Sequence, residues 1–281
     1  MRTWPQPTRG SRVDGERGSW QPCPHVDFGE LTDDAIAGDW RITQRRRGHR
    51  YSLDDVATAW EAARAVPDAQ RYADLGCGIG SVLLMVGYKL RPSFAAAIEA
   101  QAISHALAEK NLARNGLDAQ LVRGDMRRED LLDALGGARF DLVTGTPPYL
   151  PPGRGSPSTD DQRTYARLEM RGGVEAYLQA AAGVLAEGGR FVVCCGAKTP
   201  ERAIEGGRAA GLHPRHRRDV VPRAGKKGPL FTVWTFAHEP GALVEAPPLV
   251  ARDADGARTE ASHDLRRFFD LPVNVDEPPS P

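Results

Sequence analysis

The fold is decided by a stretch that reads Ala73-Asp74-Leu75-Gly76-Cys77-Gly78-Ile79-Gly80 and continues as Ser81-Val82-Leu83-Leu84-Met85-Val86. A short apolar segment ends in a cluster of glycines and a helical apolar pattern begins at once, which predicts the strand, tight turn and helix of a βαβ unit. Glycine is needed where the main chain turns sharply or lets a ligand touch the backbone. On its own, the pattern leaves open both a ligand site and a purely structural turn.

Short apolar runs then alternate with amphipathic helical patterns, which is typical of a parallel sheet covered by helices. Strands are predicted at residues 71–74, 94–98, 120–122, 140–143 and 190–194, and helices at 101–115, 129–134, 174–185 and 201–210. The strand-like runs on either side of Gly225-Lys226-Lys227-Gly228 leave no room for a crossover helix, so they predict a hairpin. The sequence therefore predicts an α/β, Rossmann-like fold with a seven-stranded, mostly parallel sheet, an antiparallel last strand and helices on both faces.

The pattern divides the chain into four segments. Residues 1–30 carry Arg, Pro and Gly without periodicity and are predicted to be a disordered or loosely docked tail. Residues 31–66 are predicted to hold one short strand at 40–42 and one helix, and residues 67–240 the sheet domain. Residues 241–281 are predicted to be a mostly irregular extension with one short helix near its end.

Composition limits the possible partners. The 281 residues include 37 Lys and Arg and 37 Asp and Glu, so no global charge favours nucleic acid or a membrane. Local basic clusters at Arg45-Arg46-Arg47 and Lys226-Lys227 are compatible with a solvated face or with substrate binding. The four cysteines form neither a disulfide framework nor a zinc ligand set, and no membrane-spanning run is present. We expect a cytoplasmic protein without a metal.

Residues just past each predicted strand are candidate ligand contacts, because ligands of open α/β sheets lie beyond the carboxyl ends of the strands. Asp74 and the glycine turn follow the first strand, Glu99 ends the second, and Asp125 follows the third. An acid about 20 residues after a glycine turn is placed to bind a ribose hydroxyl pair. Gly80 comes one residue too early for a dinucleotide turn, and Asp74 would repel a phosphate but suits the amino group of a methionine moiety.

The run Asp-Leu-Gly-Cys-Gly-Ile-Gly at 74–80, followed by Glu99 and Asp125, resembles class I S-adenosylmethionine-dependent methyltransferases, as does the antiparallel last strand. The resemblance implies S-adenosylmethionine as cofactor, with Asp125 on the adenine amino group. The candidate cofactor residues are Asp74, Gly76, Cys77, Gly78, Gly80, Glu99, Ala100, Asp125 and Met126.

The fourth strand runs into Thr146-Pro147-Pro148-Tyr149, which we predict to be the catalytic segment. Two prolines hold the chain extended and fix its carbonyls, so a carbonyl and a side-chain acceptor can together bind both hydrogens of a flat amino group. Tyr149 can stack on the ring that carries this group. A rigid structural turn is the alternative. The segment is similar to Asn-Pro-Pro-Tyr or Asp-Pro-Pro-Tyr of adenine-N6 and glutamine methyltransferases, and to Ser-Pro-Pro-Tyr of cytosine-N4 enzymes.

Residues 31–259 resemble the bacterial family that methylates adenine N6 beside the anticodon of valine tRNA. The similar stretches are Gln44 to Asp54, Ala166-Arg167-Leu168-Glu169 and Leu249 to Thr259. The resemblance implies that residues 31–66 lie over the cofactor, with Tyr51, Ser52 and Asp54 at its rim. For RNA contacts, the candidates are Arg45, Arg46, Arg47, Arg50, the 151–167 loop, Lys226 and Lys227.

The sequence thus predicts an S-adenosylmethionine-dependent enzyme that methylates a planar exocyclic amine. Adenine N6 in tRNA is the first candidate substrate, reached by a base swung out of its stack. A protein glutamine or a small amine is the alternative substrate. A nucleotide- or RNA-binding relative without activity is the alternative from a different class.

Overall fold

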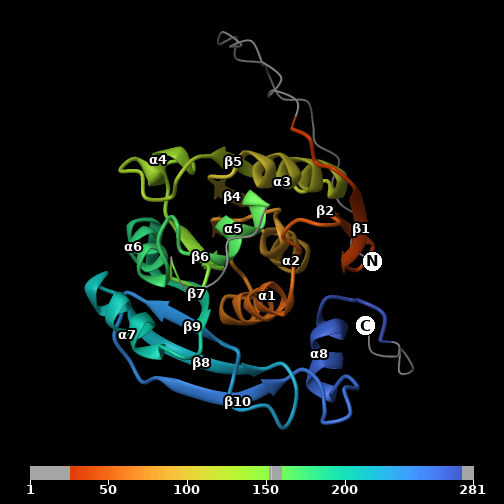
Figure 1. The fold of residues 1–281 in the computed structure, drawn as a ribbon. Helices are drawn as coiled ribbons and strands as arrows, with labels where there is room; N and C mark the ends of the chain where they lie inside the picture. Colours follow the sequence, from red (N-terminus) through yellow and green to blue (C-terminus); the bar gives the residue numbers. More distant parts are fainter. Residues whose placement is uncertain (1–25, 152, 154–159, 274–281) are drawn as a thin grey trace.

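The computed structural model describes residues 26–151, 153 and 160–273 (Figure 1). Most of the predicted tail at 1–30 and the last eight residues of the chain lie outside these ranges. The central feature is an eight-stranded sheet in the order β10-β8-β9-β7-β6-β3-β4-β5. Its strands are β3 (Arg71–Leu75), β4 (Phe94–Glu99), β5 (Gln120–Arg123), β6 (Phe140–Gly145), β7 (Leu185–Gly196), β8 (His213–Val221), β9 (Phe231–Ala237) and β10 (Val244–Val250).

The strand directions confirm the predicted fold class. β3, β4, β5, β6 and β7 are parallel neighbours, whereas β9 runs antiparallel to both β7 and β8. The predicted hairpin is therefore present between β8 and β9. The order reverses between β3 and β6, and such a switch point is where an open α/β sheet binds its ligand.

Helices cover both faces of the sheet (Figure 1). They are α1 (Leu53–Ala65), α2 (Ser81–Leu90), α3 (Ala102–Asn115), α4 (Leu131–Ala134), α5 (Asp161–Arg167), α6 (Val174–Val184), α7 (Pro200–Ala209) and α8 (Glu260–Phe268). One apolar core packs α1, α2 and α3 against Tyr72, Leu142 and Val192 of the sheet. A second core packs α4, α6 and α7 against Ala73, Val143 and Val193, the residues that directly follow these in the same strands. This alternation is the two-residue period of strands, and full burial of each large side chain contributes about 1.5–3 kcal/mol.

The glycine turn between β3 and α2 has the backbone that its sequence predicts. Gly76, Gly78 and Gly80 have φ values of 63°, 57° and 87°, a region that disfavours other residues. Close packing adds a second demand, because a Cβ on Gly76 would lie 2.3 Å from the hydroxyl oxygen of Tyr177 on α6. A Cβ on Gly78 would meet nothing within 4 Å, so open space lies against this part of the turn.

The amino-terminal part holds a hairpin where the sequence indicated one short strand. β1 (Leu31–Ala37) pairs antiparallel with β2 (Trp40–Arg45). Asn111 on α3 fixes the hairpin, since its side chain accepts from the Thr43 N–H at 2.7 Å and donates to the Thr43 carbonyl at 3.0 Å. Ser52 is the N-cap of α1, and the Asp55 carboxylate accepts from the Ser52 N–H at 2.8 Å.

Two segments differ from the expectation. The region after residue 241, predicted to be mostly irregular, contributes β10, which pairs parallel with β8 and makes an eighth strand. The sequence did not predict this strand because Pro247-Pro248 is unfavourable in a central strand. An edge strand tolerates prolines, which cannot donate hydrogen bonds, and the pairing shifts register between Ala246 and Leu249. The predicted loop at 151–167 includes the helix α5, while residues 152 and 154–159 lie outside the described ranges.

Candidate active site

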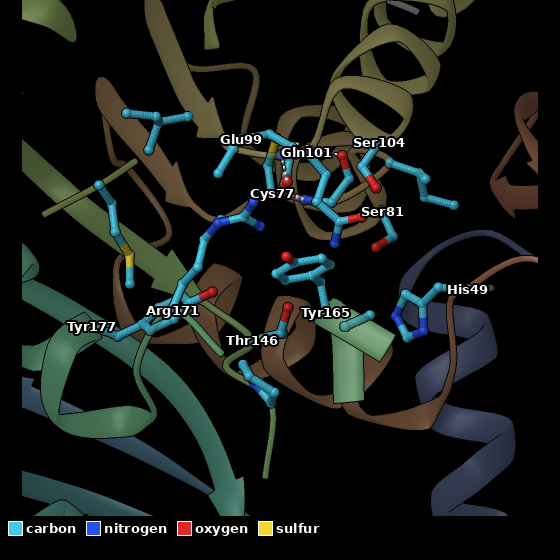
Figure 2. A pocket seen from close by; sticks show the side chains of 18 of the residues that line it. His49, Cys77, Ser81, Glu99, Gln101, Ser104, Thr146, Tyr165, Arg171 and Tyr177 are labelled. Carbon is cyan, nitrogen blue, oxygen red and sulfur yellow. Dashed lines mark hydrogen bonds between the residues drawn. The ribbon is translucent and has the colours of Figure 1, made fainter. Parts of the chain in front are cut away.

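A pocket lies at the carboxyl ends of the central strands (Figure 2). It encloses about 880 Å³ of empty space, counted with its open mouth. Many predicted site residues line it: Tyr51, Gly76, Cys77, Gly78, Glu99, Ala100, Asp125, Met126, Thr146 and Pro148. The fold thus brings the ends of β3, β4, β5 and β6 together around one cavity.

Glu99 at the end of β4 is almost buried and is anchored by two backbone donors. Its carboxylate accepts from the Gly78 N–H at 2.9 Å and from the Gln101 N–H at 2.6 Å. Burial raises the pKa of Glu99, and these two hydrogen bonds act in the opposite direction. The glycine turn and the acid after the next strand therefore form one rigid unit on the pocket wall.

Asp74 lies behind the glycine turn and is 2% exposed. Its Oδ1 accepts from the Thr144 hydroxyl at 2.7 Å, while Oδ2 has no hydrogen-bond partner among the residues that the structure describes. Burial raises the pKa of Asp74 to about 7, and the charge of Glu99 adds to this rise. A buried carboxylate oxygen without a donor costs free energy, which a cationic or N–H-bearing ligand would offset.

Asp55 in the first turn of α1 is a second buried carboxylate, and sequence reasoning did not select it. It lines the pocket, and the Ser81 hydroxyl donates to its Oδ1 at 2.8 Å. Burial and the neighbouring charge of Asp54 raise the pKa of Asp55 to about 8. Asp55 is also the acidic member of the capping box that Ser52 forms with the first turn of α1.

Two arginines lie close to the acids of this pocket. Arg127 holds Asp125 in an ion pair of 2.6 Å and lowers the pKa of that carboxyl. The guanidinium of Arg171 lies 4.3 Å from the Tyr165 ring and reaches toward Glu99 (Figure 2). Its charge lowers the pKa of both Glu99 and Asp125. Tyr165 lies in the 151–167 segment that was predicted to contact RNA, although not as a pocket residue, and Arg171 was not predicted.

Further lining residues also escaped sequence reasoning. They include His49, Ile79, Ser81, Gln101, Ser104, Ala166, Gly172 and Tyr177. Burial lowers the pKa of His49 and raises that of Tyr177. The positions of Ser104, Ala166 and Tyr177 depend on how α3, α5 and α6 approach the sheet.

The segment after β6 divides between the pocket and the interior. Thr146 and Pro148 line the pocket, and Pro147 is buried. The Tyr149 hydroxyl donates to Asp54 Oδ2 at 3.1 Å or to Cys194 Sγ at 2.9 Å, and its ring stacks on Phe231 with centroids 6.4 Å apart. Tyr149 therefore holds the Pro-Pro segment against α1 and β7 and does not line the pocket.

The predicted rim residues have different neighbours. Tyr51 lines the pocket and its hydroxyl donates to the Ala35 carbonyl at 2.9 Å. Ser52 and Asp54 do not line it: the Ser52 hydroxyl donates to Asp54, and Asp54 also meets Tyr149. Gly80 lies below the turn as the N-cap of α2.

The predicted basic residues are spread over two places. Arg45 and Arg50 form ion pairs within the structure, with Asp160 at 2.7 Å and Asp34 at 3.0 Å. Arg46 pairs with Glu30 at 3.1 Å and Arg47 is exposed. Lys226 and Lys227 are both exposed on the turn between β8 and β9.

These residues fit the predicted cofactor. S-adenosylmethionine carries a sulfonium and an ammonium group, and the cavity meets them with Asp55 and Glu99 on its wall and the unpartnered Asp74 oxygen behind the turn. The open space at Gly78 lets a ligand approach the backbone. Within the described ranges, no group of His, Cys, Asp and Glu side chains is arranged to hold a metal ion, and none of the helices there could cross a bilayer.

Comparison with solved structures finds the same fold in another protein. A crystal structure described as a predicted O-methyltransferase, from Agrobacterium tumefaciens, superposes with a TM-score of 0.57. The match covers 79% of this chain and 99% of that one at 18% identity, so it shows the fold alone.

Sequence comparison gives the family. The profile of the methyltransferase small domain family matches residues 55–204, just over half of the chain, and the chain belongs to this family. This confirms the predicted enzyme class and the predicted cofactor, S-adenosylmethionine.

Curated relatives fall into two groups. A tRNA1(Val) (adenine(37)-N6)-methyltransferase of Porphyromonas gingivalis is 30% identical over 54% of this chain and 60% of its own length. Another of that name, from Actinobacillus pleuropneumoniae, is 27% identical over 70% and 81%. A release factor glutamine methyltransferase of Geobacter sulfurreducens is 33% identical over 32% and 30%. The first and third matches span less than two thirds of the relatives' lengths.

Proposed function

We propose that this protein transfers a methyl group from S-adenosylmethionine to a planar exocyclic amine, adenine N6 in tRNA. The observation that carries the proposal is the position of Thr146 and Pro148, which line the same cavity as the glycine turn and Glu99. An acceptor for an amino group thus lies on the wall of the pocket that suits the cofactor. The relatives named as tRNA adenine-N6 methyltransferases support the substrate.

The chemistry asks little of the protein beyond orientation. S-adenosylmethionine, when bound, supplies an electrophilic methyl group. Pro147 and Pro148 fix the backbone after β6, so the Thr146 hydroxyl and a neighbouring carbonyl accept the two amine hydrogens. These hydrogen bonds hold the nitrogen lone pair in one direction and strengthen as the nitrogen gains positive charge. No strong base is required.

Tyr165 takes the stacking role that the sequence predicted for Tyr149. The Tyr149 ring stacks on Phe231, and its hydroxyl donates to Asp54 or Cys194. Tyr165 instead lines the cavity, and its ring lies next to Thr146 in Figure 2. Stacking on an aromatic ring contributes about 1–3 kcal/mol per base. We therefore assign Tyr165 to the target ring and Tyr149 to positioning of the Pro-Pro segment.

A glutamine amide is the second candidate substrate. It is also a planar amine, and relatives named release factor and ribosomal protein uL3 glutamine methyltransferases match this chain. Nothing in the Thr146 geometry separates the two amines, since both present two hydrogens in one plane.

The test is a transfer assay with radiolabelled S-adenosylmethionine. Purified protein is incubated with unmodified tRNA, and in parallel with release factors and ribosomal proteins. We expect label that ribonuclease removes and protease does not. Label in the protein samples alone would show that the substrate is a protein side chain and not adenine. Cofactor binding without label in any sample would contradict the catalytic proposal.

A further inference from the structure

A second cavity lies beside the candidate active site and carries the opposite charge. It is formed where the β1–β2 hairpin, α1 and α8 come together (Figure 1). Among the residues that the structure describes, its lining includes four arginines and one carboxylate: Arg50, Arg252, Arg258 and Arg266, with Asp34. We call these four residues the arginine groove. They come from both ends of the chain and meet only in the folded protein.

The arginines are held in place by the protein itself. Arg50 donates to Thr32 Oγ1 at 2.7 Å and to Asp34 at 3.0 Å. One Arg252 guanidinium nitrogen donates to the Gly256 carbonyl at 2.7 Å, and Arg266 Nε donates to the Pro272 carbonyl at 2.7 Å. A ligand would therefore meet donors that are already ordered, which reduces the entropy cost of binding.

The arginine groove and the active-site pocket lie on either side of a shared residue. Tyr51 lines both cavities. The charges of Arg266 and Arg50 both lower the pKa of Tyr51, against a larger opposite effect of burial, so both guanidinium groups lie within electrostatic reach of its hydroxyl. A ligand in the arginine groove therefore passes directly beside the cavity that holds Thr146.

The predicted lysine turn borders the same surface. The Ala224 N–H donates to the Arg252 carbonyl at 2.8 Å, which ties the turn after β8 to the loop between β10 and α8. Lys226 and Lys227 are exposed on that turn. The basic residues thus extend from the pocket along the carboxy-terminal segment, although the chain as a whole has no net charge.

We propose that the arginine groove binds the phosphodiester backbone of the RNA substrate beside the nucleotide whose base enters the active-site pocket. The proposal rests on the proposed function for its choice of RNA. Arginine presents a planar fork of donors that matches phosphate oxygens. Phosphate contacts fix the register of a nucleic acid while carrying no base specificity, which suits a groove next to a base pocket.

The test compares two arginines that are neighbours on α8. Arg266 lines the groove, whereas Arg267 pairs with Glu260 and Asp264 and does not. Arg266→Gln and Arg267→Gln each remove one positive charge. Fluorescence anisotropy measures the affinity of wild type and both variants for labelled tRNA between 50 and 200 mM KCl. Calorimetry with S-adenosylmethionine checks that each variant folds.

We expect Arg266→Gln to weaken tRNA binding about 5–10-fold at the lowest salt, with a salt slope reduced by roughly 0.7–0.9 for one lost phosphate contact. Arg267→Gln should bind like wild type, and all three proteins should bind the cofactor equally. Equal tRNA affinity of the two variants would overturn the proposal. So would a polyglutamate peptide that binds the wild type more tightly than RNA of equal charge does.

These outcomes are separate from those of the proposed function. If tRNA binds with the expected dependence on Arg266 but accepts no methyl group, the methylation proposal fails and the arginine groove stands. If tRNA is methylated and Arg266→Gln behaves like Arg267→Gln, the groove assignment fails and the methylation proposal stands.

Discussion

Two neighbouring cavities of this protein share the side chain of Tyr51 and differ in charge. The first cavity is lined by the acids Asp55, Glu99 and Asp125 and by one arginine, Arg171, among the described residues. The second is lined by the arginine groove and by one acid, Asp34. An overall net charge of zero conceals this separation. A cationic cofactor and a polyanionic substrate can therefore bind side by side, each on a surface of the opposite charge.

The comparison assigns each kind of binding to its own side chains. Carboxylates of the first cavity, together with Asp74 behind its glycine turn, should control cofactor affinity. Arginines of the second cavity should control RNA affinity, and the segment after β6 should control the transfer step. A substitution that weakens two of these three properties together would break the division.

The largest effect is expected for Asp74→Asn. The amide keeps the size of the side chain and the contact with Thr144 but removes the charge of the unpartnered Oδ2. We expect S-adenosylmethionine affinity to fall about 10–100-fold, the range for a lost hydrogen bond to a charged group. Calorimetry measures this loss, and Asp130→Asn on the exposed Arg128 pair serves as the control. An equal loss of tRNA affinity would contradict the division.

The next effect concerns the acceptor in the catalytic segment. Thr146→Val has nearly the same shape but lacks the hydroxyl, so we expect the single-turnover rate to fall about 10-fold. Thr146→Ser keeps the hydroxyl and should retain most of the rate. Both variants should bind cofactor and tRNA like wild type. If valine and serine give the same rate, the hydroxyl does not accept the amine hydrogen.

A smaller effect is expected at Tyr149. Tyr149→Phe keeps the stack on Phe231 and removes the hydroxyl that bonds Asp54 and Cys194. We expect the transfer rate to fall about 3–10-fold because the Pro-Pro segment loses an anchor. Tyr165→Phe serves as the companion variant, since a stacking ring does not need its hydroxyl. A Tyr149→Phe enzyme that also loses cofactor affinity would place Tyr149 in the pocket instead.

The smallest effect is a pH trend that belongs to the acidic cavity alone. The folded-state pKa values of Asp55, about 8, and Asp74, about 7, lie above the unfolded value of about 3.9. Their contribution to stability is therefore largest below pH 4 and declines as the pH rises toward 8. A cationic ligand favours the ionised carboxyls, so its stabilising effect should increase over the same range.

Thermal unfolding with and without S-adenosylmethionine at pH 6, 7 and 8 measures both trends. Asp55→Asn removes one titrating group, and the difference between wild type and this variant cancels titration of the cofactor itself. We expect the melting temperature of the free wild type, relative to the variant, to decrease from pH 6 to 8. A cofactor-induced shift with the same pH dependence in both proteins would contradict the role of Asp55.

Local patterns predicted most of the fold. The glycine turn, the alternating runs and the short loop before residue 231 determine the parallel core and the antiparallel β9 through short-range rules. β10 was missed because Pro247-Pro248 disqualifies a central strand, and only pairing along the edge of the sheet shows that the prolines are tolerated. Of the β1–β2 hairpin only β2 was predicted, because β1 carries Asp33 and Asp34 among its apolar residues.

The site was predictable where one residue follows one strand. Glu99, Asp125 and Thr146 were found because the topology alone places them at the pocket. Asp55 was not, because the inward orientation of the first turn of α1 depends on tertiary packing. The arginine groove could not be foreseen either: Arg50 and Arg266 are 216 positions apart in the sequence and meet only through the packing of α8 beside the hairpin.

The central proposal is that the protein methylates the N6 amine of adenine in tRNA, with the cofactor in the acidic cavity and the RNA backbone on the arginine groove. Mass analysis of the nucleosides of unmodified tRNA, after incubation with purified protein and S-adenosylmethionine, tests it most directly. The account predicts N6-methyladenosine, greatly reduced with Asp74→Asn and reduced at high salt with Arg266→Gln. Methylated tRNA without N6-methyladenosine, or unmodified tRNA beside methylated glutamine in a protein sample, would contradict it.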